Sequence, residues 1–228
     1  MFFTPYFEEE LFVKYNAVLF DLDGTLLDTL DDLGDSMNAV LDAAGHPTHP
    51  IDAYRYFIGD GIENLVRRAL PADHRDNQSV ALGKEAMDAE YAGRWNAKTK
   101  PYAGVPQLLD ELSRRQVPSA ILSNKPEPFT LLAVKELLAA WSFHPIRGAR
   151  PDTPRKPDPA GALAIAAELG AAPADCLYLG DTDTDMKTAG TAGMYAVGAT
   201  WGFRPGAELK ASGAQSLIDE PTGLLDLL

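Results

Sequence analysis

The sequence predicts an α/β protein in which a doubly wound parallel sheet is interrupted by an inserted bundle of α-helices. Two observations predict this fold class. Short, continuous apolar runs that end in turn residues alternate with segments whose apolar residues recur at helical intervals. One long segment, from about residue 30 to residue 98, shows helical patterns only. We therefore expect a core of residues 1–29 and 99–228 and an inserted α-helical domain of residues 30–98.

The core elements follow from these runs. Strands that are apolar throughout are typical of parallel sheets, because helices cover both faces of such sheets. A glycine, Gly170, ends the last of the predicted core helices, as is common at helix C-termini. The expected strands are residues 17–20, 119–122, 176–179 and 195–197, and the expected helices are residues 105–112, 129–137 and 159–169.

The insertion contains three amphipathic stripes, which favour helices that bury their apolar faces against one another. Its return to the core, residues 98–104, is interpreted as a hinge. The stripes consist of Leu33, Met37, Val40 and Leu41; of Ile62, Leu65, Val66 and Ala69; and of Met87, Tyr91 and Trp95.

Composition narrows the range of functions. The 20 basic and 33 acidic residues give a net charge of −13, which argues against nucleic acid and anionic membranes as partners. The single cysteine, Cys176, excludes an internal disulfide and is expected to be buried in a strand. No signal sequence or membrane-spanning run is evident, so we expect a cytoplasmic protein. The N-terminal aromatic residues, such as Phe3 and Phe7, are interpreted as an edge cover or a dimer contact, which leaves monomer and homodimer open.

Polar residues follow three of the predicted strands. Asp21 and Asp23 follow the first, and Asp181 and Asp185 follow the third. Carboxyl ends of parallel strands meet at one edge of the sheet, where ligands of such folds bind. Clustered carboxylates repel one another unless a cation or a shared proton intervenes, and Mg²⁺ favours such oxygen ligands. Each acid alone is also consistent with a helix N-cap.

Three further positions complete this pattern. Ser123 and Asn124 end the second strand, and Lys156 lies in a proline-rich loop that is expected to be extended. Each alone is typical of a turn or of a solvated charge. Because all of them are expected at the same edge of the sheet, together they indicate one functional site.

These residues resemble the four motifs of the haloacid dehalogenase superfamily. The resemblance covers about residues 15–225 and implies a Rossmann-like core with an α-helical cap between the first two motifs. The matching positions are Asp21, Asp23, Gly24 and Thr25 in the first motif, Ser123 and Asn124 in the second, Lys156 in the third, and Gly180, Asp181 and Asp185 in the fourth.

The resemblance implies a Mg²⁺-dependent phosphatase that acts on a small phosphorylated metabolite through an aspartyl-phosphate. Asp21 is then the nucleophile and Asp23 the general acid and base. Lys156 belongs to the same catalytic set. The implied Mg²⁺ ligands are Asp21, Asp23 and Asp181, the implied phosphate-binding residues are Thr25, Ser123, Asn124 and Lys156, and Asp185 supports Lys156 or ligand waters.

Residues 57–65 are similar to the cap loop of phosphoglycolate phosphatases. Gly59, Asp60 and Gly61 are therefore expected to contact the substrate, with 2-phosphoglycolate first among the candidates. The glycines allow close approach of the backbone, and the helix that begins there presents N–H groups to an anion. The charge of Asp60 is unfavourable beside the carboxylate of 2-phosphoglycolate unless the Asp60 side chain points away. An ordinary glycine-rich loop is the alternative interpretation.

Other activities stay open at this point. A phosphosugar mutase shares the cap and the core, and a non-catalytic scaffold could use the cap as an interaction surface. The complete set of motifs argues against the scaffold. A carbon–halogen hydrolase is disfavoured by the presence of Asp23, and a phosphonate hydrolase by the scarcity of lysine in the insertion, where only Lys84 and Lys98 occur.

Overall fold

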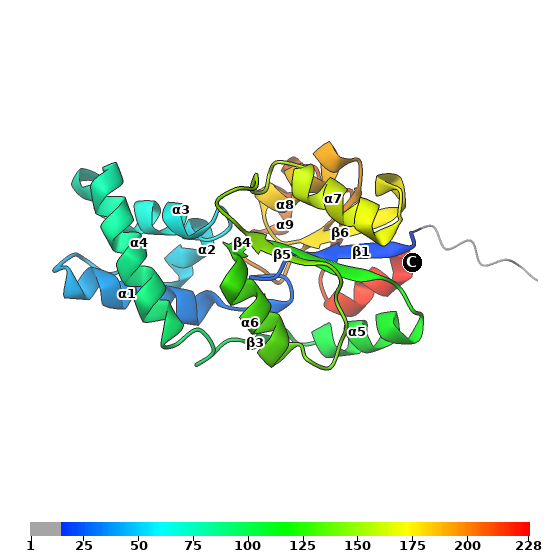
Figure 1. Ribbon diagram of the computed structural model, residues 1–228, viewed down its shortest axis with the longest axis horizontal. Helices are drawn as coiled ribbons and strands as arrows, with labels where there is room; N and C mark the ends of the chain where they lie inside the picture. The colour runs from blue at the N-terminus through cyan, green and yellow to red at the C-terminus, as the bar shows by residue number, and fades with distance from the viewer. Residues whose placement is uncertain (1–14) are drawn as a thin grey trace, which may run out of the picture.

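A computed structural model describes residues 15–228, so the aromatic N-terminal positions lie outside the described residues. The core is a six-stranded parallel sheet in the order β5-β4-β1-β6-β7-β8 (Figure 1). This sheet confirms the predicted doubly wound α/β fold. Its strands are β1 (Ala17–Phe20), β4 (Ser119–Pro126), β5 (Ile146–Ala149), β6 (Cys176–Gly180), β7 (Tyr195–Ala199) and β8 (Ser216–Ile218).

Helices cover both faces of the sheet because alternate side chains of each strand point to opposite sides. Val18 and Phe20 pack in one apolar cluster, while Ala17 and Leu19 pack in another. In Figure 1, α5 and α6 lie below the sheet and α7, α8 and α9 above it. The helices are α5 (Val105–Arg114), α6 (Glu127–Leu137), α7 (Ala160–Leu169), α8 (Asp183–Ala192) and α9 (Gly206–Ala211).

The position of β1 determines where the polar strand ends meet. β1 pairs with β4 on one side and with β6 on the other, and Phe20 is in register with both Ile121 and Leu179. The residues that follow β1 and β6 therefore emerge beside the last residues of β4. Cys176 is fully buried at the start of β6, as expected.

Two edge strands of the sheet have no counterpart among the predicted strands. β5 contains Arg147 and Gly148 and is only half-buried, and β8 has three residues. An edge strand keeps one side in contact with solvent, so it lacks the continuous apolar run that identifies a buried strand.

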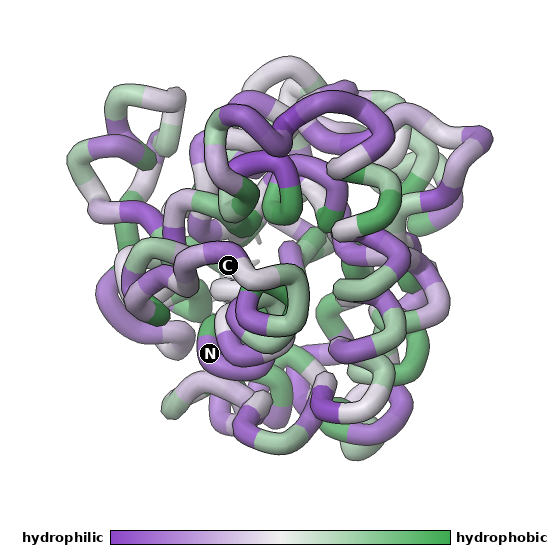
Figure 2. The backbone as a smooth tube through the Cα atoms, turned by 90° about the vertical axis from the view of Figure 1, so that its left-hand side faces the viewer, coloured by the Kyte–Doolittle hydropathy of each residue, from purple (hydrophilic) through white to green (hydrophobic). Residues whose placement is uncertain are grey.

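The four helices of the insertion lie between two short strands that pair with each other, β2 (Leu27–Asp28) and β3 (Lys100–Pro101). We call them the cap helices: α1 (Leu30–Ala43), α2 (Tyr54–Phe57), α3 (Ile62–Ala69) and α4 (Asn77–Ala92). Hydrophobic positions recur between hydrophilic ones along them (Figure 2). Met37, Leu41, Val66 and Met87 are fully buried in one cluster. Trp95 is also buried, although α4 ends before it.

Short 3₁₀ turns complete the connections, at η1 (Ile51–Ala53), η2 (Ala72–His74), η3 (Pro173–Asp175) and η4 (Pro221–Leu227). Within residues 15–228, no helix combines the length and the apolar character that crossing a membrane requires.

A buried carboxylate fastens the segment that returns from the cap helices to the core. Asp32, in the first turn of α1, accepts hydrogen bonds from the backbone N–H groups of Lys98 (2.9 Å) and Thr99 (2.8 Å). It also accepts one from the Thr99 hydroxyl, at 2.7 Å. The segment interpreted from the sequence as a hinge, residues 98–104, is thus hydrogen-bonded to α1 and paired with β2.

We expect Asp32→Ala to lower the free energy of unfolding by roughly 2 to 3 kcal/mol, because it leaves the buried N–H and hydroxyl of Thr99 and the partly buried N–H of Lys98 without an acceptor. Urea unfolding would measure the change. Asp31→Ala is the matched control, since Asp31 lies in the same helical turn but is exposed. That control should cost less than about 1 kcal/mol. Equal losses in the two variants would contradict the role given to Asp32.

Candidate active site

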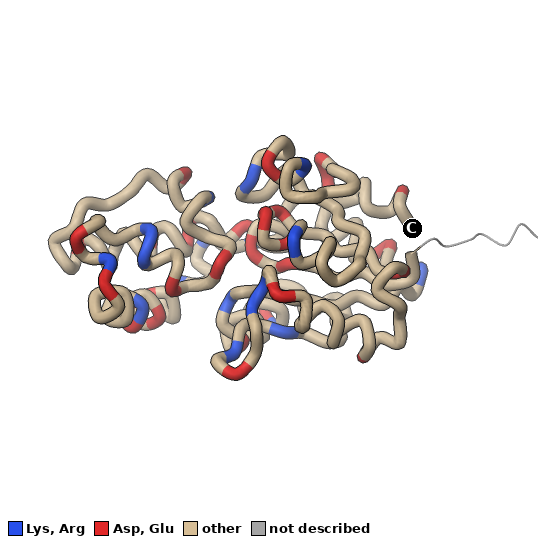
Figure 3. Tube along the Cα trace, turned by 90° about the horizontal axis from the view of Figure 1, so that it is seen from above, with Lys and Arg blue, Asp and Glu red and all other residues tan. Residues whose placement is uncertain are grey.

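The polar residues singled out in the sequence gather at the carboxyl edge of the sheet. Asp21 and Asp23 directly follow β1, and Asp181 directly follows β6. Ser123 and Asn124 belong to β4 itself. In Figure 3, acidic segments gather where the cap helices meet the core. The topology therefore brings together side chains that are up to 160 positions apart in the sequence.

An ammonium group lies between two buried carboxylates in this cluster. Lys156 Nζ donates a hydrogen bond to Asp185 Oδ1 at 2.6 Å. It also lies 2.8 Å from Asp21 Oδ1, in an ion pair whose alignment is not that of a hydrogen bond. Burial alone would lower the pKa of Lys156, but Asp185 and Asp21 outweigh this effect and raise it well above its usual value. Lys156 is thus a fixed positive charge beside Asp21.

Asp185 has a second contact that fixes its orientation. It forms a capping box at the start of α8, in which its Oδ2 accepts hydrogen bonds from the N–H (3.1 Å) and the hydroxyl (2.7 Å) of Thr182. The two sequence interpretations of Asp185, a support for Lys156 and a helix-terminal carboxylate, therefore both describe contacts that the structure contains.

Asp181 is fully buried and is held by two donors. The Thr25 hydroxyl donates to its Oδ1 (2.9 Å), and the Phe203 N–H donates to its Oδ2 (2.7 Å). Burial raises the pKa of Asp181 well above its usual value, and the nearby carboxylates of Asp185 and Asp21 raise it further. The donors lower that pKa, but they do not offset the repulsion.

The pKa of Asp21 is also raised. Burial is the largest cause that raises the pKa of Asp21 to about 7, and the charge of Asp185 adds to it against the opposing effect of Lys156. A carboxylate whose ionised form is this unfavourable in the folded chain favours a bound cation, which would stabilise that form.

The carboxylates of the cluster fit such a cation. One oxygen each of Asp21, Asp181 and Asp185 lies within 4.8 Å of the others, and all three residues are buried. The ammonium of Lys156 pairs with two of these carboxylates, those of Asp21 and Asp185, so negative charge is in excess among the three. Oxygen donors in this number and charge suit a hard divalent cation. The carboxylate of Asp23 is not part of this group, because it faces Lys125.

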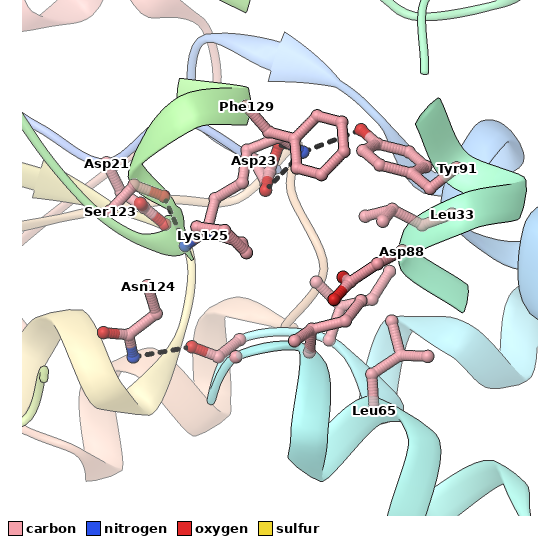
Figure 4. Close-up of a pocket in the computed structure, with 15 residues that line it drawn as sticks. Asp21, Asp23, Leu33, Leu65, Asp88, Tyr91, Ser123, Asn124, Lys125 and Phe129 are labelled. Atoms are coloured by element: carbon pink, nitrogen blue, oxygen red, sulfur yellow. Dashed lines mark hydrogen bonds and ion pairs between the residues drawn. The ribbon is translucent and has the colours of Figure 1, made fainter. Parts of the chain in front are cut away.

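Asp23 forms an ion pair with Lys125, the lysine of β4. Lys125 Nζ lies 3.2 Å from both carboxylate oxygens of Asp23 and donates a further hydrogen bond to the Tyr91 hydroxyl at 2.7 Å. Burial alone would lower the pKa of Lys125, but Asp23 and then Tyr91 outweigh it and raise the pKa. Tyr91 comes from α4, so this contact joins a cap helix to the core (Figure 4).

The close packing of these groups requires a glycine after Asp23. Gly24 has a φ of +89°, in the region that disfavours side chains. A Cβ atom at this position would lie only 2.2 Å from Asp181 Oδ2. The glycine of the first motif thus allows the chain after β1 to approach the carboxylate after β6.

Asn124 joins three segments of the site. Its Nδ2 donates to the carbonyl oxygens of Lys156 (3.0 Å) and Gly59 (3.1 Å), so both amide hydrogens are engaged within the chain. Ser123 is also buried, and its Oγ accepts the N–H of Lys125 at 3.2 Å. Of these two residues, Ser123 keeps a hydroxyl hydrogen available for a ligand.

The predicted cap loop divides into two kinds of residue. Gly59 and Gly61 line the cavity described below, whereas Asp60 does not. The carboxylate of Asp60 instead accepts hydrogen bonds from Arg68 and, at 2.7 Å, from the Thr184 hydroxyl. Burial alone would raise the pKa of Asp60, but these two partners outweigh it and lower the pKa. Asp60 therefore contacts the core helix α8.

Two arginines fasten the cap helices to the loop that follows β7. Arg204 is buried and donates to the carbonyl oxygens of Arg55 and Ile58, the latter at 3.1 Å. Arg55 donates in return to the carbonyl oxygen of Gly202 at 2.7 Å. The same loop holds Asp181 through the Phe203 N–H, so one segment contacts both the carboxylate cluster and the cap.

A cavity of about 40 Å³ lies between the cap helices and the core (Figure 4). Asp21 and Asp23 line its core side, and Leu33 and Leu65 contribute apolar side chains from the cap. Of the described residues that line it, Lys125 alone is basic. The volume holds roughly three water molecules, so a ligand that fits here is small.

A model of the haloacid dehalogenase-like hydrolase family matches residues 18–199, which is more than half of the sequence. The chain belongs to the haloacid dehalogenase-like hydrolases. This membership confirms the resemblance that the four motifs predicted, and the matched region begins in β1 and ends with β7.

The named relatives of this chain include phosphoglycolate phosphatases. The phosphoglycolate phosphatase of Pseudomonas putida is 36% identical over 214 residues, which cover 91% of this chain and 78% of that protein. That of Psychrobacter arcticus is 31% identical over 222 residues, with 92% and 94% covered. The crystal structure of a candidate phosphoglycolate phosphatase from Lactobacillus delbrueckii subsp. bulgaricus has a TM-score of 0.86 at 28% identity and covers 92% of this chain and 96% of its own. These similarities confirm the prediction of a phosphoric monoester hydrolase.

The sequence interpretation missed two residues of this haloacid dehalogenase-like site. The sequence places Tyr91 in an apolar helical stripe, whose spacing indicates burial but gives no partner for a hydroxyl. Arg204 lies in the loop before α9, outside the four motifs. A signal for it was the position of this loop directly after β7, at the edge of the sheet where the motifs gather.

The acid cluster predicts a pH dependence of stability in the metal-free protein. The pKa of Asp21 is about 7 in the folded chain and about 3.9 in the unfolded chain, so between these values only the folded state keeps the proton. Stability therefore falls as the pH rises from about 4 to 7. Asp21→Asn removes this contribution, so at pH 8 the variant should be roughly 2 to 4 kcal/mol more stable than the wild type, with little difference at pH 4.

Urea unfolding in excess chelator at both pH values would measure this difference. Asp183→Asn is the control, because Asp183 is half-exposed and forms an ion pair with Lys187 outside the cluster. It should change with pH as the wild type does. If Asp21→Asn also followed the wild type, the repulsion assigned to Asp21 would be wrong.

Proposed function

We propose that this hydrolase is a Mg²⁺-dependent phosphatase that acts on a small phosphorylated metabolite, with 2-phosphoglycolate favoured, through an aspartyl-phosphate on Asp21. The observation that carries the proposal is the position of Asp21. Its carboxylate lines a small cavity, lies 2.8 Å from a buried ammonium, and shares its surroundings with two further buried carboxylates. Such a group is a nucleophile held in one orientation.

In the proposed first step, an Asp21 oxygen forms a bond to phosphorus while the bond between phosphorus and the leaving oxygen breaks. Asp23 gives its proton to the leaving oxygen. In the second step, Asp23 takes a proton from a water molecule, which attacks the phosphorus and releases Asp21. Asp23 lines the same cavity as Asp21, so both groups reach one bound phosphate.

The other residues would hold the phosphate. Lys156 supplies positive charge beside Asp21, and Ser123 supplies a buried hydroxyl near it. Such fixed donors stabilise the charge that develops on the transferred group. The Thr25 hydroxyl donates to Asp181 in this structure, so we propose that Thr25 orients this carboxylate. Asn124 would position Lys156 and the Gly59 backbone.

The carboxylates of Asp21 and Asp181 would hold Mg²⁺, together with the Asp23 backbone carbonyl that the family resemblance implies. The bound ion supplies positive charge that neutralises the phosphate and the transferred oxygens. Asp185, which also belongs to the cluster, is engaged by Lys156 and Thr182, so its proposed role is to position Lys156.

The size and lining of the cavity support a small substrate. Asp60 points to Arg68 and Thr184, so its charge does not oppose an anionic substrate in the cavity. Gly59 and Gly61 present backbone there instead. Several relatives carry the name phosphoglycolate phosphatase, which supports 2-phosphoglycolate and favours hydrolysis over transfer to a sugar.

Asp21→Asn should reduce the rate of Mg²⁺-dependent phosphate release by about a thousandfold or more, because the amide is a poor nucleophile. A colorimetric phosphate assay with purified protein would measure it, with circular dichroism to show that the variant folds. Asp183→Asn serves again as the control and should keep the wild-type rate. Retained turnover in Asp21→Asn would refute Asp21 as the nucleophile. Turnover in excess chelator would refute the Mg²⁺ assignment.

A panel of phosphorylated metabolites tests the substrate. We expect 2-phosphoglycolate to exceed the other phosphate esters about tenfold or more in kcat/KM, which corresponds to about 1.4 kcal/mol of transition-state stabilisation. A uniform, slow profile would keep the phosphatase chemistry and reject this substrate. Phosphate transfer from a sugar bisphosphate to a sugar phosphate would instead identify a mutase.

A further inference from the structure

We propose that Tyr91 of α4 is a positioning residue that acts through Lys125 on the catalytic acid Asp23. The inference rests on the proposed function, because it takes Asp23 as the group that protonates the leaving oxygen. It adds a cap residue to the groups on which proton transfer depends.

The first step of the argument is the contact between Lys125 and Asp23. The ammonium lies 3.2 Å from each of the two carboxylate oxygens, so it contacts both and restricts rotation of the carboxyl group. Both side chains are largely buried, with 3% of Lys125 and 12% of Asp23 exposed. Little water competes for this contact, and the orientation of Asp23 therefore follows the position of the ammonium.

The second step is the contact between Tyr91 and Lys125. The hydroxyl of Tyr91 accepts a hydrogen bond from Nζ at 2.7 Å, which is shorter than either contact with Asp23. The ring also lies close, with its centroid 4.6 Å from Nζ. Tyr91 is itself fixed, because it is buried and packs edge-on against Phe129 with 5.2 Å between the ring centroids. A rigid cap residue thus holds a flexible lysine side chain in place.

The third step connects this geometry with the leaving group. When the bond between phosphorus and an alkyl oxygen breaks, the proton of Asp23 must pass to that oxygen. A misoriented Asp23 therefore slows the cleavage of an alkyl phosphate. p-Nitrophenolate is a stable anion and leaves without that proton. The orientation of Asp23 should accordingly matter for alkyl phosphates and have little influence on p-nitrophenyl phosphate.

The experiment compares kcat/KM for two substrates in wild type and Tyr91→Phe. This quantity covers the steps up to the first cleavage and excludes hydrolysis of the aspartyl-phosphate. The substrates are p-nitrophenyl phosphate and 2-phosphoglycolate, or the alkyl phosphate of the panel that the wild type hydrolyses fastest. Tyr91→Phe keeps the ring and removes only the hydroxyl. We expect the ratio of alkyl to aryl kcat/KM to fall about tenfold.

Tyr54→Phe is the matched control. Tyr54 is a buried tyrosine of α2 whose hydroxyl is likewise in one hydrogen bond, which it donates to Asn38 at 2.8 Å, but it is not hydrogen-bonded to Lys125. A general loss of cap stability would affect both variants and both substrates. The ratio in Tyr54→Phe should therefore equal that of the wild type.

A double-mutant cycle tests whether Tyr91 acts through Lys125. Lys125→Met should lower the ratio at least as much as Tyr91→Phe, and the double variant should equal Lys125→Met alone. Additive losses, or an unchanged ratio in Tyr91→Phe, would overturn the inference. Failure of the proposed function gives a different result, since the wild type would then not cleave p-nitrophenyl phosphate or Asp21→Asn would still cleave it.

Discussion

Repulsion among buried carboxylates is the constraint on which the rest of the structure depends. Asp21, Asp181 and Asp185 come together because their strands and helix meet at one edge of the sheet, and burial removes the water that would screen them. The chain offsets part of this cost with Lys156, with a hydroxyl and an N–H on Asp181, and with the capping box of α8. The high pKa of Asp21 shows that the compensation is incomplete. A site that is unfavourable when empty favours binding of a cation and its anionic ligand, which is what phosphoryl transfer requires.

The polar site and the cap are joined by direct contacts. Asn124 reaches the backbone of Gly59, Lys125 reaches Tyr91, and the loop that carries Arg204 also holds Asp181. The two halves of the cavity are therefore positioned by the same few residues of β4 and of the loop after β7. This arrangement explains how a small cavity between the cap helices and the core can keep Asp21, Asp23 and Lys125 in defined orientations.

The sequence predicts the parts of this molecule that follow from burial and order along the chain. The four inner strands have continuous apolar runs, and the motif residues follow those runs at predictable positions. The edge strands β5 and β8 could not be predicted in this way, because strands in contact with solvent lack a continuous apolar run. Contacts between distant segments could not be predicted either. The spacing of Tyr91 indicates a buried face, but only the folded chain shows Lys125 beside its hydroxyl, or Asp60 turned from the cavity toward Thr184.

The pairing of β2 with β3 bears on how the sequence of such a protein can change during evolution. The chain leaves the core and returns to it at two adjacent points, both fastened near Asp32. Residues between these points contribute the apolar wall of the cavity, whereas the carboxylates and Lys156 lie outside them. A substitution in that wall, for example at Leu33 or Leu65, is expected to alter which molecule fits while the core carboxylates and Lys156 stay in place. Under the proposed function, the apolar wall can therefore diverge while the core carboxylates and the cap residue Tyr91, which is proposed to act through Lys125 on Asp23, are retained.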